Sequence, residues 1–580
     1  MSEGERECET YRERLKFFNW KIEFPEVFPE IDRPDDPANG FHLILGNPPW
    51  DKTKFEEPLF FAQHHSNYRT LPNSQKRKIA HDLLARPAIK QRYEREKETI
   101  ELANAYLQAK FPLSRGAGDN NLFRFFVERA LGLLAPRGGL SYLAPTGLLT
   151  EAGSFKLRKN ILENFRLKSF DGFENRNRLF PAVDSRYKFG LIQLEKVRDP
   201  DQVAQTRFRL TDPADLATNE GCFPYSLAEI KATSPKHLAY LETSGGELGL
   251  KILLKLYKKF PPLEPTWLDF RNELHATKDK KLFHESNNPG FIPLYKGEMI
   301  GQYQAFKAPP KYWLDPAEFD NYLLSSRLKT LKNDLKAQYA WDEGFAKAFP
   351  EGFQWPRILA FLEASSDQDL ARFLVPERSL WRLAFRAIAR DTDERTLIAA
   401  LVPQNRGAQN SLWISIPGRY ALDLSQRKIV YQRVSLARLL FAQALFNSLV
   451  VDWILRASMA MNVNKTYFQR LPLPQPDDER LLADPTYLDL VKDSAFLSLC
   501  QGRELWADLK RAIAFDDSEI PPSPLIFDRR QAGLDFKIAT LYGLTPEELE
   551  IILDGFKVLR AKRSNYCSLI IDLINNKSLP

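Results

Sequence analysis

The amino-acid sequence predicts an α/β protein: a mainly parallel sheet covered by helices, then a mixed α+β region, then a helical C-terminus. Three observations predict this order. Apolar runs alternate with an amphipathic segment over residues 1–200, aromatic and basic residues mix with short strand-like runs over 301–475, and helical patterns prevail over 476–580. Residues 201–300 are polar and contain several prolines, so we interpret them as a connector.

The first region contains the pattern of a βαβ unit. The uninterrupted apolar run "FHLILG" (41–46) predicts a buried strand. "NLFRFFVERALGLLAPRGG" (121–139) predicts an amphipathic helix that ends at its Pro-Arg-Gly-Gly, and "LSYLAP" (140–145) and "YKFGLIQLEKV" (187–197) predict two further strands. Strand, long helix and strand in this order indicate a parallel sheet.

The later regions carry their own signals. Within the connector, "ELGLKILLKLYKKF" (247–260) predicts a helix, and "NSLWISIPGRYALDLSQRKIVYQRV" (410–434) predicts strands and loops of the mixed region. In the C-terminal region, "LTPEELEIILDGF" predicts a helix with Thr545 as N-cap and Pro546 at its first position.

Composition narrows the protein class. Hydrophobic residues make up 44% of the 580-residue chain, which allows large cores, but no run of about 18 uncharged apolar residues predicts a membrane span. The charged N-terminus lacks the apolar core of a signal peptide. The four cysteines, Cys8, Cys222, Cys500 and Cys567, show neither metal-ligand nor disulfide spacing. We therefore expect a cytoplasmic protein without a metal site.

The stretch "LILGNPPWDK" is the strongest chemical signal. Pro48 and Pro49 have no N–H, so they must end the strand in a rigid turn at the sheet edge where α/β proteins bind ligands. The Asn47 amide oxygen and the Pro48 carbonyl are two fixed acceptors that suit an amino group, and Trp50 offers a flat face for stacking its ring. The alternative is a surface turn with an incidental tryptophan.

Residues 47–50 resemble the fourth motif, (D/N/S)PP(Y/F/W), of amino-methyltransferases that use S-adenosylmethionine. "NLFRFFVERALGLLAPRGGLSYLAPTGLLT" is similar to their next two motifs, and "ENRNRLFPAVDSRYKFGLIQLEK" is similar to their base-stacking hairpin. Farther on, "LYKGEMIGQY", "RTLIAALVP", "LFNSLVVDWILR" and "ATLYGLTPEELEIIL" resemble parts of gamma-class, Type IIG and Eco57I-like adenine-specific DNA methyltransferases of restriction–modification systems.

This resemblance implies methyl transfer from S-adenosylmethionine to N6 of an adenine flipped out of double-stranded DNA. It implies a catalytic turn of Asn47, Pro48, Pro49 and Trp50, with Trp50 and Phe180 stacking on the base. Phe126 matches an aromatic that lines the cofactor's adenine pocket in relatives, although a core phenylalanine on an amphipathic helix is an equal interpretation.

The resemblance also implies a cofactor-binding motif ahead of residue 47. Relatives have a strand and Gly-containing loop there, whereas "FFNWKIEFPEVF" (17–28) can supply one short strand at most. "RGAGDN" (115–120) follows a poor strand, and we interpret it as a flexible turn. We therefore expect a partial class I (Rossmann-like) methyltransferase sheet, in a split or truncated enzyme that needs an upstream polypeptide. Residues 41–46 would otherwise form an exposed apolar edge.

The mixed region has the composition of a DNA-binding, target-recognition region. Between residues 371 and 470, fifteen Lys and Arg face six Asp and Glu. "ERSLWRLAFRAIARDTDERT" spaces arginines four apart, which on a helix gives one phosphate-binding stripe. The residues concerned are Arg378, Arg382, Arg386 and Arg390, followed by Arg395. The alternative is a surface stripe paired with neighbouring carboxylates.

Three functions remain open. The first is an N6-adenine DNA methyltransferase of a restriction–modification or phage-defence system. The second is a catalytically dead DNA-binding specificity subunit of such a system. The third is a methyltransferase acting on RNA or on a protein glutamine, since those also use this motif, but the long region after residue 200 argues against it.

Overall fold

The computed structural model describes most of the chain in two compact units, 1–247 and 248–580. The described residues are 18–30, 32–33, 36–115, 120–340, 362–390, 393–423, 428–459, 463, 465–501, 509 and 524–576. The predicted turn at 116–119 lies outside them.

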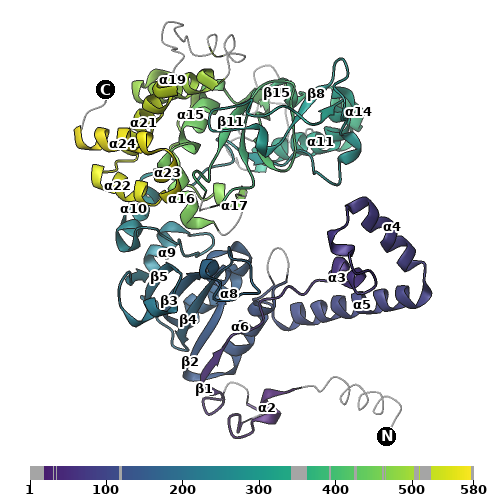
Figure 1. The fold of residues 1–580 in the computed structure, drawn as a ribbon, viewed down its shortest axis with the longest axis vertical. Coiled ribbons are helices and arrows are strands. Elements are labelled where there is room, and N and C mark those ends of the chain that lie inside the picture. Colours follow the sequence, from purple (N-terminus) through teal and green to yellow (C-terminus); the bar gives the residue numbers. More distant parts are fainter. Residues whose placement is uncertain are drawn as a thin grey trace, which may run out of the picture. The chain divides into compact units, whose positions relative to one another are not determined.

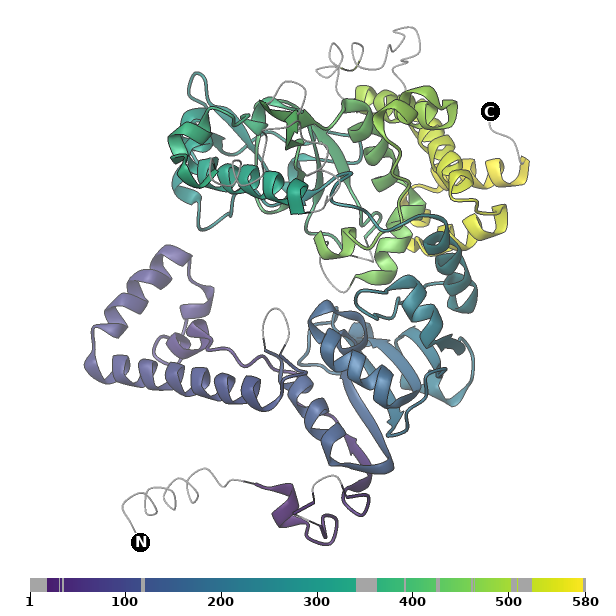
Figure 2. The ribbon, with the colours of Figure 1, turned by 180° about the vertical axis from the view of Figure 1, so that it is seen from behind.

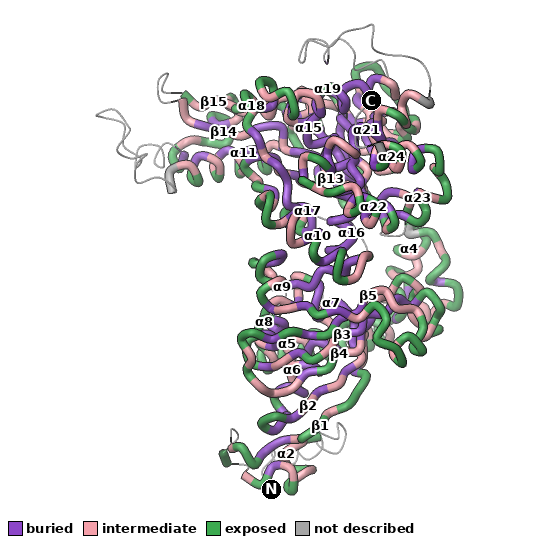
Figure 3. Tube along the Cα trace, turned by 90° about the vertical axis from the view of Figure 1, so that its left-hand side faces the viewer, coloured by how far each residue is buried: buried purple, intermediate pink, exposed green. Residues whose placement is uncertain are grey.

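The first unit is built on a six-stranded mixed sheet (Figure 1). Its order is β1-β2-β4-β3-β5-β6, where β1 pairs with β2 and β3 with β5 in parallel, and the other neighbours are antiparallel. The strands are β1 (Phe41–Gly46), β2 (Leu134–Pro145), β3 (Arg166–Glu174), β4 (Lys188–Glu195), β5 (Val203–Leu210) and β6 (Phe223–Ser226). Buried residues concentrate along β3 and β4 (Figure 3).

This sheet confirms the predicted α/β class, but the prediction of a mainly parallel sheet is wrong: three of its five neighbouring pairs are antiparallel, because β4 runs against both β2 and β3, and β6 runs against β5. Two predicted boundaries also differ. Strands β5 and β6 lie in the range that was interpreted as a connector. They belong to the sheet of the first unit instead, where they follow β3. The predicted helix over 121–139 is shorter: α6 (Leu122–Leu133) ends before Pro136, and β2 already pairs with β1 from Leu134. Proline cannot continue a helix, so the chain becomes extended there.

Strand β1 lies at one edge of the sheet and is bonded only to β2 among the described strands. The side chains of Leu43 and Leu45 are 59% and 69% exposed. Alternate residues of a strand share a face, so these two leucines form an uncovered apolar patch. The predicted strand is confirmed, but it is not buried as its apolar run had suggested. It has the exposed apolar edge that was expected for residues 41–46.

A helical arm leaves the sheet directly after residues 47–50. It comprises α3 (Glu57–Ala62), α4 (Asn73–Leu84) and α5 (Pro87–Lys110), and it extends away from the sheet (Figures 1 and 2). Its own small core forms around Phe60, Phe61 and Tyr68. None of the described side chains of α5 is buried. The sequence analysis did not predict this arm.

The second unit contains three small sheets, most of whose strands lie in the predicted mixed region. Two strands, 270–271 and 292–295, lie in the range that was interpreted as a connector, because they pair with strands of the mixed region. Its four-stranded antiparallel sheet has the order β11-β10-β13-β7, and a hairpin pairs β14 with β15. The strands are β7 (Phe270–Arg271), β10 (Arg382–Arg386), β11 (Ala399–Val402), β13 (Leu412–Ser415), β14 (Gly418–Asp423) and β15 (Lys428–Arg433). The third sheet pairs β8 (Ile292–Tyr295) with β12 (Gly407–Ala408) and β9 (Trp313–Leu314).

Helices cover these sheets and fill the C-terminal region as predicted. The predicted connector helix is α10 (Gly246–Lys259), and α22 (Pro546–Asp554) begins with the expected Thr545 cap, closed into a capping box with Glu548. The other long helices are α11 (Pro316–Ala340), α15 (Leu436–Phe446), α16 (Leu449–Ser458), α19 (Pro485–Gln501), α21 (Pro524–Leu541) and α24 (Ser564–Asn576).

No single helix of the described residues is long and apolar enough to cross a membrane. The bent pair α15 and α16, which meet at 66°, reaches that length and composition only together.

Gly190→Ala should destabilise the first unit. A Cβ at Gly190 would overlap the Phe170 ring in the sheet core, so we expect a loss of about 1–3 kcal/mol in the free energy of unfolding. Calorimetry of the full chain would measure this as a lower melting temperature. In the control Gly132→Ala, the new Cβ on α6 meets nothing within 4 Å, so the melting temperature should hold or rise. Equal behaviour of both variants would contradict the packing described.

Candidate active site at the carboxyl edge of the sheet

Three loops meet at one edge of the first unit's sheet. Strands β1, β2 and β3 run in the same direction, because β1 is parallel to β2, and both β2 and β3 are antiparallel to β4. Their carboxyl ends therefore bring together residues 47–50, the turn after Pro145 and the loop after Glu174. This is the edge at which α/β sheets bind ligands.

The Asn47 side chain is exposed at this edge, and its amide makes no hydrogen bond with any residue that the structure describes. Pro48 is buried, which anchors the turn in the unit. A polar amide on a rigid turn, free of protein partners, is available to accept a hydrogen bond from a ligand.

Trp50 lies in a cluster of aromatic rings. Its indole stacks on Tyr187, with centroids 5.8 Å apart and planes at 7°, and on Phe189 at 5.7 Å. Phe180 meets the same indole edge-on at 5.0 Å. The indole Nε1 is buried without a hydrogen-bond partner among the described residues. The cluster thus holds Trp50 half-buried beside the exposed Asn47.

Trp50 and Phe180, the two predicted base-stacking residues, are therefore brought together from positions far apart in the chain. They touch each other, however, rather than facing each other across a gap. A base stacked between two rings needs centroids about 7 Å apart, twice a carbon–carbon contact distance. Because these centroids are 5.0 Å apart, Phe180 must move before a base can enter between them.

The loop that carries Phe180 is fastened by Asn175, which is fully buried. Its Nδ2 donates to the carbonyl oxygens of Phe180 and Val183, each at 3.0 Å, and its Oδ1 accepts from the Phe180 N–H at 2.9 Å. These bonds fix the backbone at Phe180 and leave its ring free to turn. No local pattern marks Asn175 beyond its place in the hairpin loop.

Tyr187 is a second residue that the sequence analysis missed. Burial raises the pKa of its phenol, and the carboxylates of Glu151 and Asp51 raise it further. The phenol therefore stays protonated and neutral at physiological pH. Tyr187 is therefore a neutral aromatic ring that stacks on Trp50.

Phe126 does not belong to the core. Its side chain on α6 is 45% exposed, whereas its neighbours Phe123, Phe125 and Val127 are buried. The interpretation as a core phenylalanine is therefore wrong, and a role in a cofactor pocket stays a prediction.

The arginine stripe predicted on a helix is also wrong. Arg382 and Arg386 lie on strand β10, and only the short turn 377–379 before it is helical. Arg382 is fully buried, with its Nη1 2.7 Å from Glu273 Oε1. Arg395 is buried against Asp452, with 2.9 Å between Nε and Oδ2. Buried guanidinium groups need such partners, so these two charges are used inside the second unit.

The remaining arginines of the predicted stripe differ in exposure. The Arg378 guanidinium pairs with Asp320 at 2.8 Å, and Arg386 donates to the carbonyl of Ile300. Arg390 is exposed, and its side chain forms no ion pair within the described part of the chain. DNA binding by these three stays a prediction.

Comparisons with known proteins give likenesses only among solved structures. No protein-family model matches the sequence, and no curated protein does. The Type IIL restriction-modification enzyme MmeI, solved in complex with DNA, aligns at 9% identity and a TM-score of 0.39, covering 92% of this chain and 59% of that one. The type IIG restriction endonuclease BpuSI aligns at 14% identity and a TM-score of 0.29, covering 78% and 52%.

A smaller likeness involves a putative class I S-adenosylmethionine-dependent methyltransferase from Listeria monocytogenes. It aligns at 22% identity and a TM-score of 0.16, over 19% of this chain and 34% of that one. This chain thus spans between half and three fifths of the length of MmeI and BpuSI.

Asn175→Ala should loosen the loop that carries Phe180. Four hydrogen bonds to the loop backbone are lost, so amide hydrogen exchange in residues 176–186 should become about ten to a hundred times faster. Mass spectrometry of exchanged peptides would measure this. The control Asn177→Ala, in the same loop, removes one exposed bond to the carbonyl of Thr211 and should change exchange little. Identical exchange in both variants would contradict the role given to Asn175.

Arg382→Met should destabilise the second unit strongly, because it leaves Glu273 without its closest buried ion-pair partner. We expect a loss of about 3 kcal/mol in the free energy of unfolding, measured by denaturant titration. Arg390→Met removes an exposed charge and should change that free energy by about 0.5 kcal/mol or less. A stable Arg382→Met variant would contradict the structural role given to this buried ion pair.

Proposed function

We propose that this chain is the base-binding part of a site-specific DNA methyltransferase, which transfers a methyl group from S-adenosylmethionine to N6 of a flipped adenine. One observation carries the proposal: an exposed Asn47 amide with no hydrogen-bond partner among the described residues stands on a double-proline turn, next to the Trp50–Phe180–Tyr187 ring cluster.

The turn suits an amino group as substrate. The amide oxygen of Asn47 and the carbonyl of Pro48 both accept hydrogen bonds, and neither proline can donate one. Two acceptors orient an exocyclic NH₂ and stabilise the positive charge that develops on its nitrogen during attack on a methyl group. No general base is required before the attack, because a neutral amine is already a nucleophile.

The ring cluster suits a planar base. Trp50 supplies a large flat face, and its packing against Tyr187 and Phe189 holds that face still. A base inside a duplex cannot reach this edge, so the target adenine must leave the stack. Its entry would displace the Phe180 ring from Trp50 and place it on the other side of the base.

The described residues fit the cofactor only in part. Phe126 offers an exposed ring that could stack on an adenine, but the first unit's described residues show no Gly-rich turn between a strand and a helix at this edge. S-adenosylmethionine would supply the methyl group when bound, and Phe126 is the described residue that would contact it.

A partner polypeptide carrying the cofactor-binding motif would complete the site. The edge of β1 has unpaired backbone groups and two exposed leucines, Leu43 and Leu45, beside the Asn47 turn. A parallel strand from the partner would bond to this edge and cover the apolar patch, and it would bring a cofactor next to the acceptors. We infer an upstream-encoded partner of this kind.

A DNA-binding specificity subunit without catalysis is the second candidate. The contact between Trp50 and Phe180 favours it, because the rings leave no room for a base in this structure. A methyltransferase that acts on RNA or on a protein glutamine would use the same two acceptors. Methyl incorporation therefore has to be compared between DNA, RNA and protein substrates.

The test is incorporation of a radiolabelled methyl group into adenine of duplex DNA. We expect incorporation when this chain is mixed with the product of the adjacent upstream reading frame, and little with either alone. Asn47→Ala should lower incorporation about a hundred- to a thousandfold, because the amine loses an acceptor that acts in the transition state, while DNA binding stays within about twofold.

The matched control is Asn219→Ala, which removes another exposed amide of the first unit and should keep full transfer. Salt-sensitive DNA binding without transfer in any mixture would establish the specificity subunit instead. Transfer to RNA or to glutamine, but not to DNA, would refute the DNA assignment.

A further inference from the structure

The helical arm carries a concentration of positive charge at the end distant from the sheet. Residues 66–95 contain eight Lys and Arg against two Asp and Glu, a net charge of +6 in a chain whose total is +7. This segment comprises the turn before α4, all of α4 and the start of α5. The charge is thus gathered on one small part of the first unit, which we call the arm tip.

Most of these basic side chains form no ion pair or hydrogen bond inside the described part of the arm. Lys76 donates to the carbonyl of Arg69, and Lys90 and Arg92 pair along α5 with Glu94 and Glu96. The other five basic side chains are exposed and form no ion pair with any residue that the structure describes; they are Arg69, Arg77, Lys78, Arg86 and Arg95. Unpaired exposed cations gathered in this way attract a polyanion.

The apolar side chains of α4 lie on the side of the helix that faces the small core of the arm. Leu83 is buried, and Ile79 and Leu84 pack against the cluster of Phe60 and Phe61. Large exposed hydrophobic side chains occur elsewhere on the arm, for example Leu102 on α5, but none lies in residues 66–95. A surface that binds lipid inserts apolar side chains, so the tip suits a nucleic acid better than a membrane.

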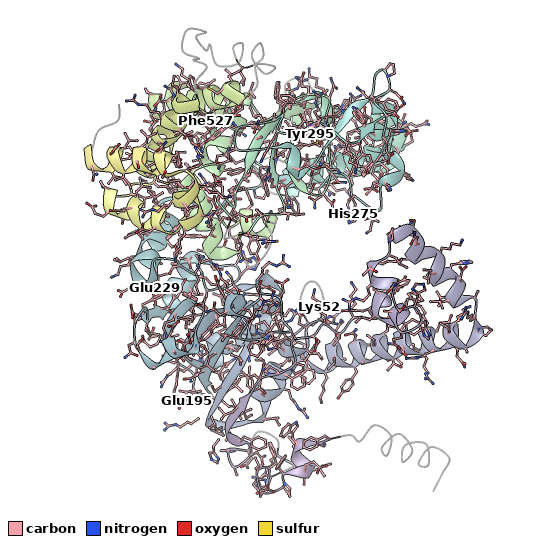
Figure 4. All side chains as sticks on the ribbon, in the orientation of Figure 1. Lys52, Glu195, Glu229, His275, Tyr295 and Phe527 are labelled. Carbon is pink, nitrogen blue, oxygen red and sulfur yellow. The ribbon has the colours of Figure 1, made fainter. Side chains whose placement is uncertain are left out.

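The arm is fastened beside the candidate active site. Its two ends meet in a stem, where the Leu122 N–H donates to the Asp51 carbonyl at 2.9 Å and Thr53 N–H to Asn120 at 3.0 Å. Lys52, labelled in Figure 4, lies in this stem between the sheet and the arm. Asn104 of α5 donates to the carbonyl of Thr53 at 2.6 Å, which holds the long helix at the stem.

The length of α5 matches a stretch of duplex DNA. Its 24 residues extend about 36 Å at 1.5 Å per residue, which equals about ten base pairs at 3.4 Å each. If Asn47 meets a flipped base at one end of the arm, the arm tip lies about one helical turn away along the same duplex.

We propose that the arm tip binds the phosphate backbone of duplex DNA that flanks the target base, through Arg69, Arg77, Lys78 and Arg86. The proposal rests on the proposed function, because only a DNA base at Asn47 places a duplex beside the arm. The contacts are to phosphates, so they add affinity and fix orientation without reading sequence.

The experiment measures binding of a fluorescein-labelled 40-bp duplex to the full chain by anisotropy, at several salt concentrations and without cofactor. The test variant combines Arg69→Gln, Arg77→Gln, Lys78→Gln and Arg86→Gln. The control variant combines Lys159→Gln, Lys168→Gln, Lys231→Gln and Lys236→Gln, which are exposed lysines of the same unit outside the arm. Both variants lose four charges, and thermal melting verifies that both remain folded.

We expect the tip variant to bind at least about tenfold more weakly at moderate salt. The slope of log Kd against log salt should fall by about 3.6, since each of the four lost phosphate contacts removes about 0.9. The control should keep both within error. Equal losses in the two variants, or no measurable DNA binding by the unmodified chain, would overturn the proposal.

Two further readouts distinguish DNA binding by the arm tip from membrane binding and from the proposed methyl transfer. Binding of the unmodified chain to phosphatidylserine vesicles that the tip variant loses, with DNA binding unchanged, would assign the tip to a membrane and overturn the proposal. If the unmodified chain transfers no methyl group in any mixture, the proposed function is refuted. A reduced salt slope of the tip variant in that case still supports the DNA contact.

Discussion

The pairing of β1 with β2 on one side only is the constraint on which the first unit's site depends. Parallel pairing from Leu43 to Gly46 fixes where the strand stops, and the two prolines that follow cannot extend the ladder. Asn47 is therefore presented at the carboxyl edge of the sheet, together with the turns after β2 and β3. The same one-sided pairing leaves Leu43 and Leu45 uncovered, so one strand both positions the turn and offers an edge for a partner.

The aromatic cluster balances stability against access. Packing of Trp50 against Tyr187, Phe189 and Phe180 keeps the motif ordered without a ligand, because each ring buries apolar surface against its neighbours. The same packing fills the space that a base requires. Asn175 fastens the backbone of the loop and not the Phe180 ring, so the ring can turn aside while the loop stays in place. Opening of the cluster is thus confined to one side chain.

Positive charge has two different uses in this chain. In the second unit, Arg382 and Arg395 are buried against Glu273 and Asp452. These pairs tie strand β10 and helix α16 to loop segments that are far away in the sequence. A buried guanidinium without such a partner would be unfavourable by several kcal/mol. On the arm tip, the cations remain exposed because α4 buries only its apolar side. Net charge over a segment therefore does not distinguish a binding surface from an internal network; burial does.

The sequence by itself determined the elements whose signals are local. The apolar run of β1, the prolines after Asn47, the strand β4 and the Thr545 cap all depend on neighbouring residues, and all are found. Only the tertiary structure decided which way the arginines face, since Glu273 lies 109 residues from Arg382 and Asp452 lies 57 from Arg395. It also decided that Trp50 touches Phe180, that Tyr187 joins them and that β5 and β6 complete the sheet. These outcomes depend on packing between distant segments, and no local pattern records which distant partner a side chain will meet.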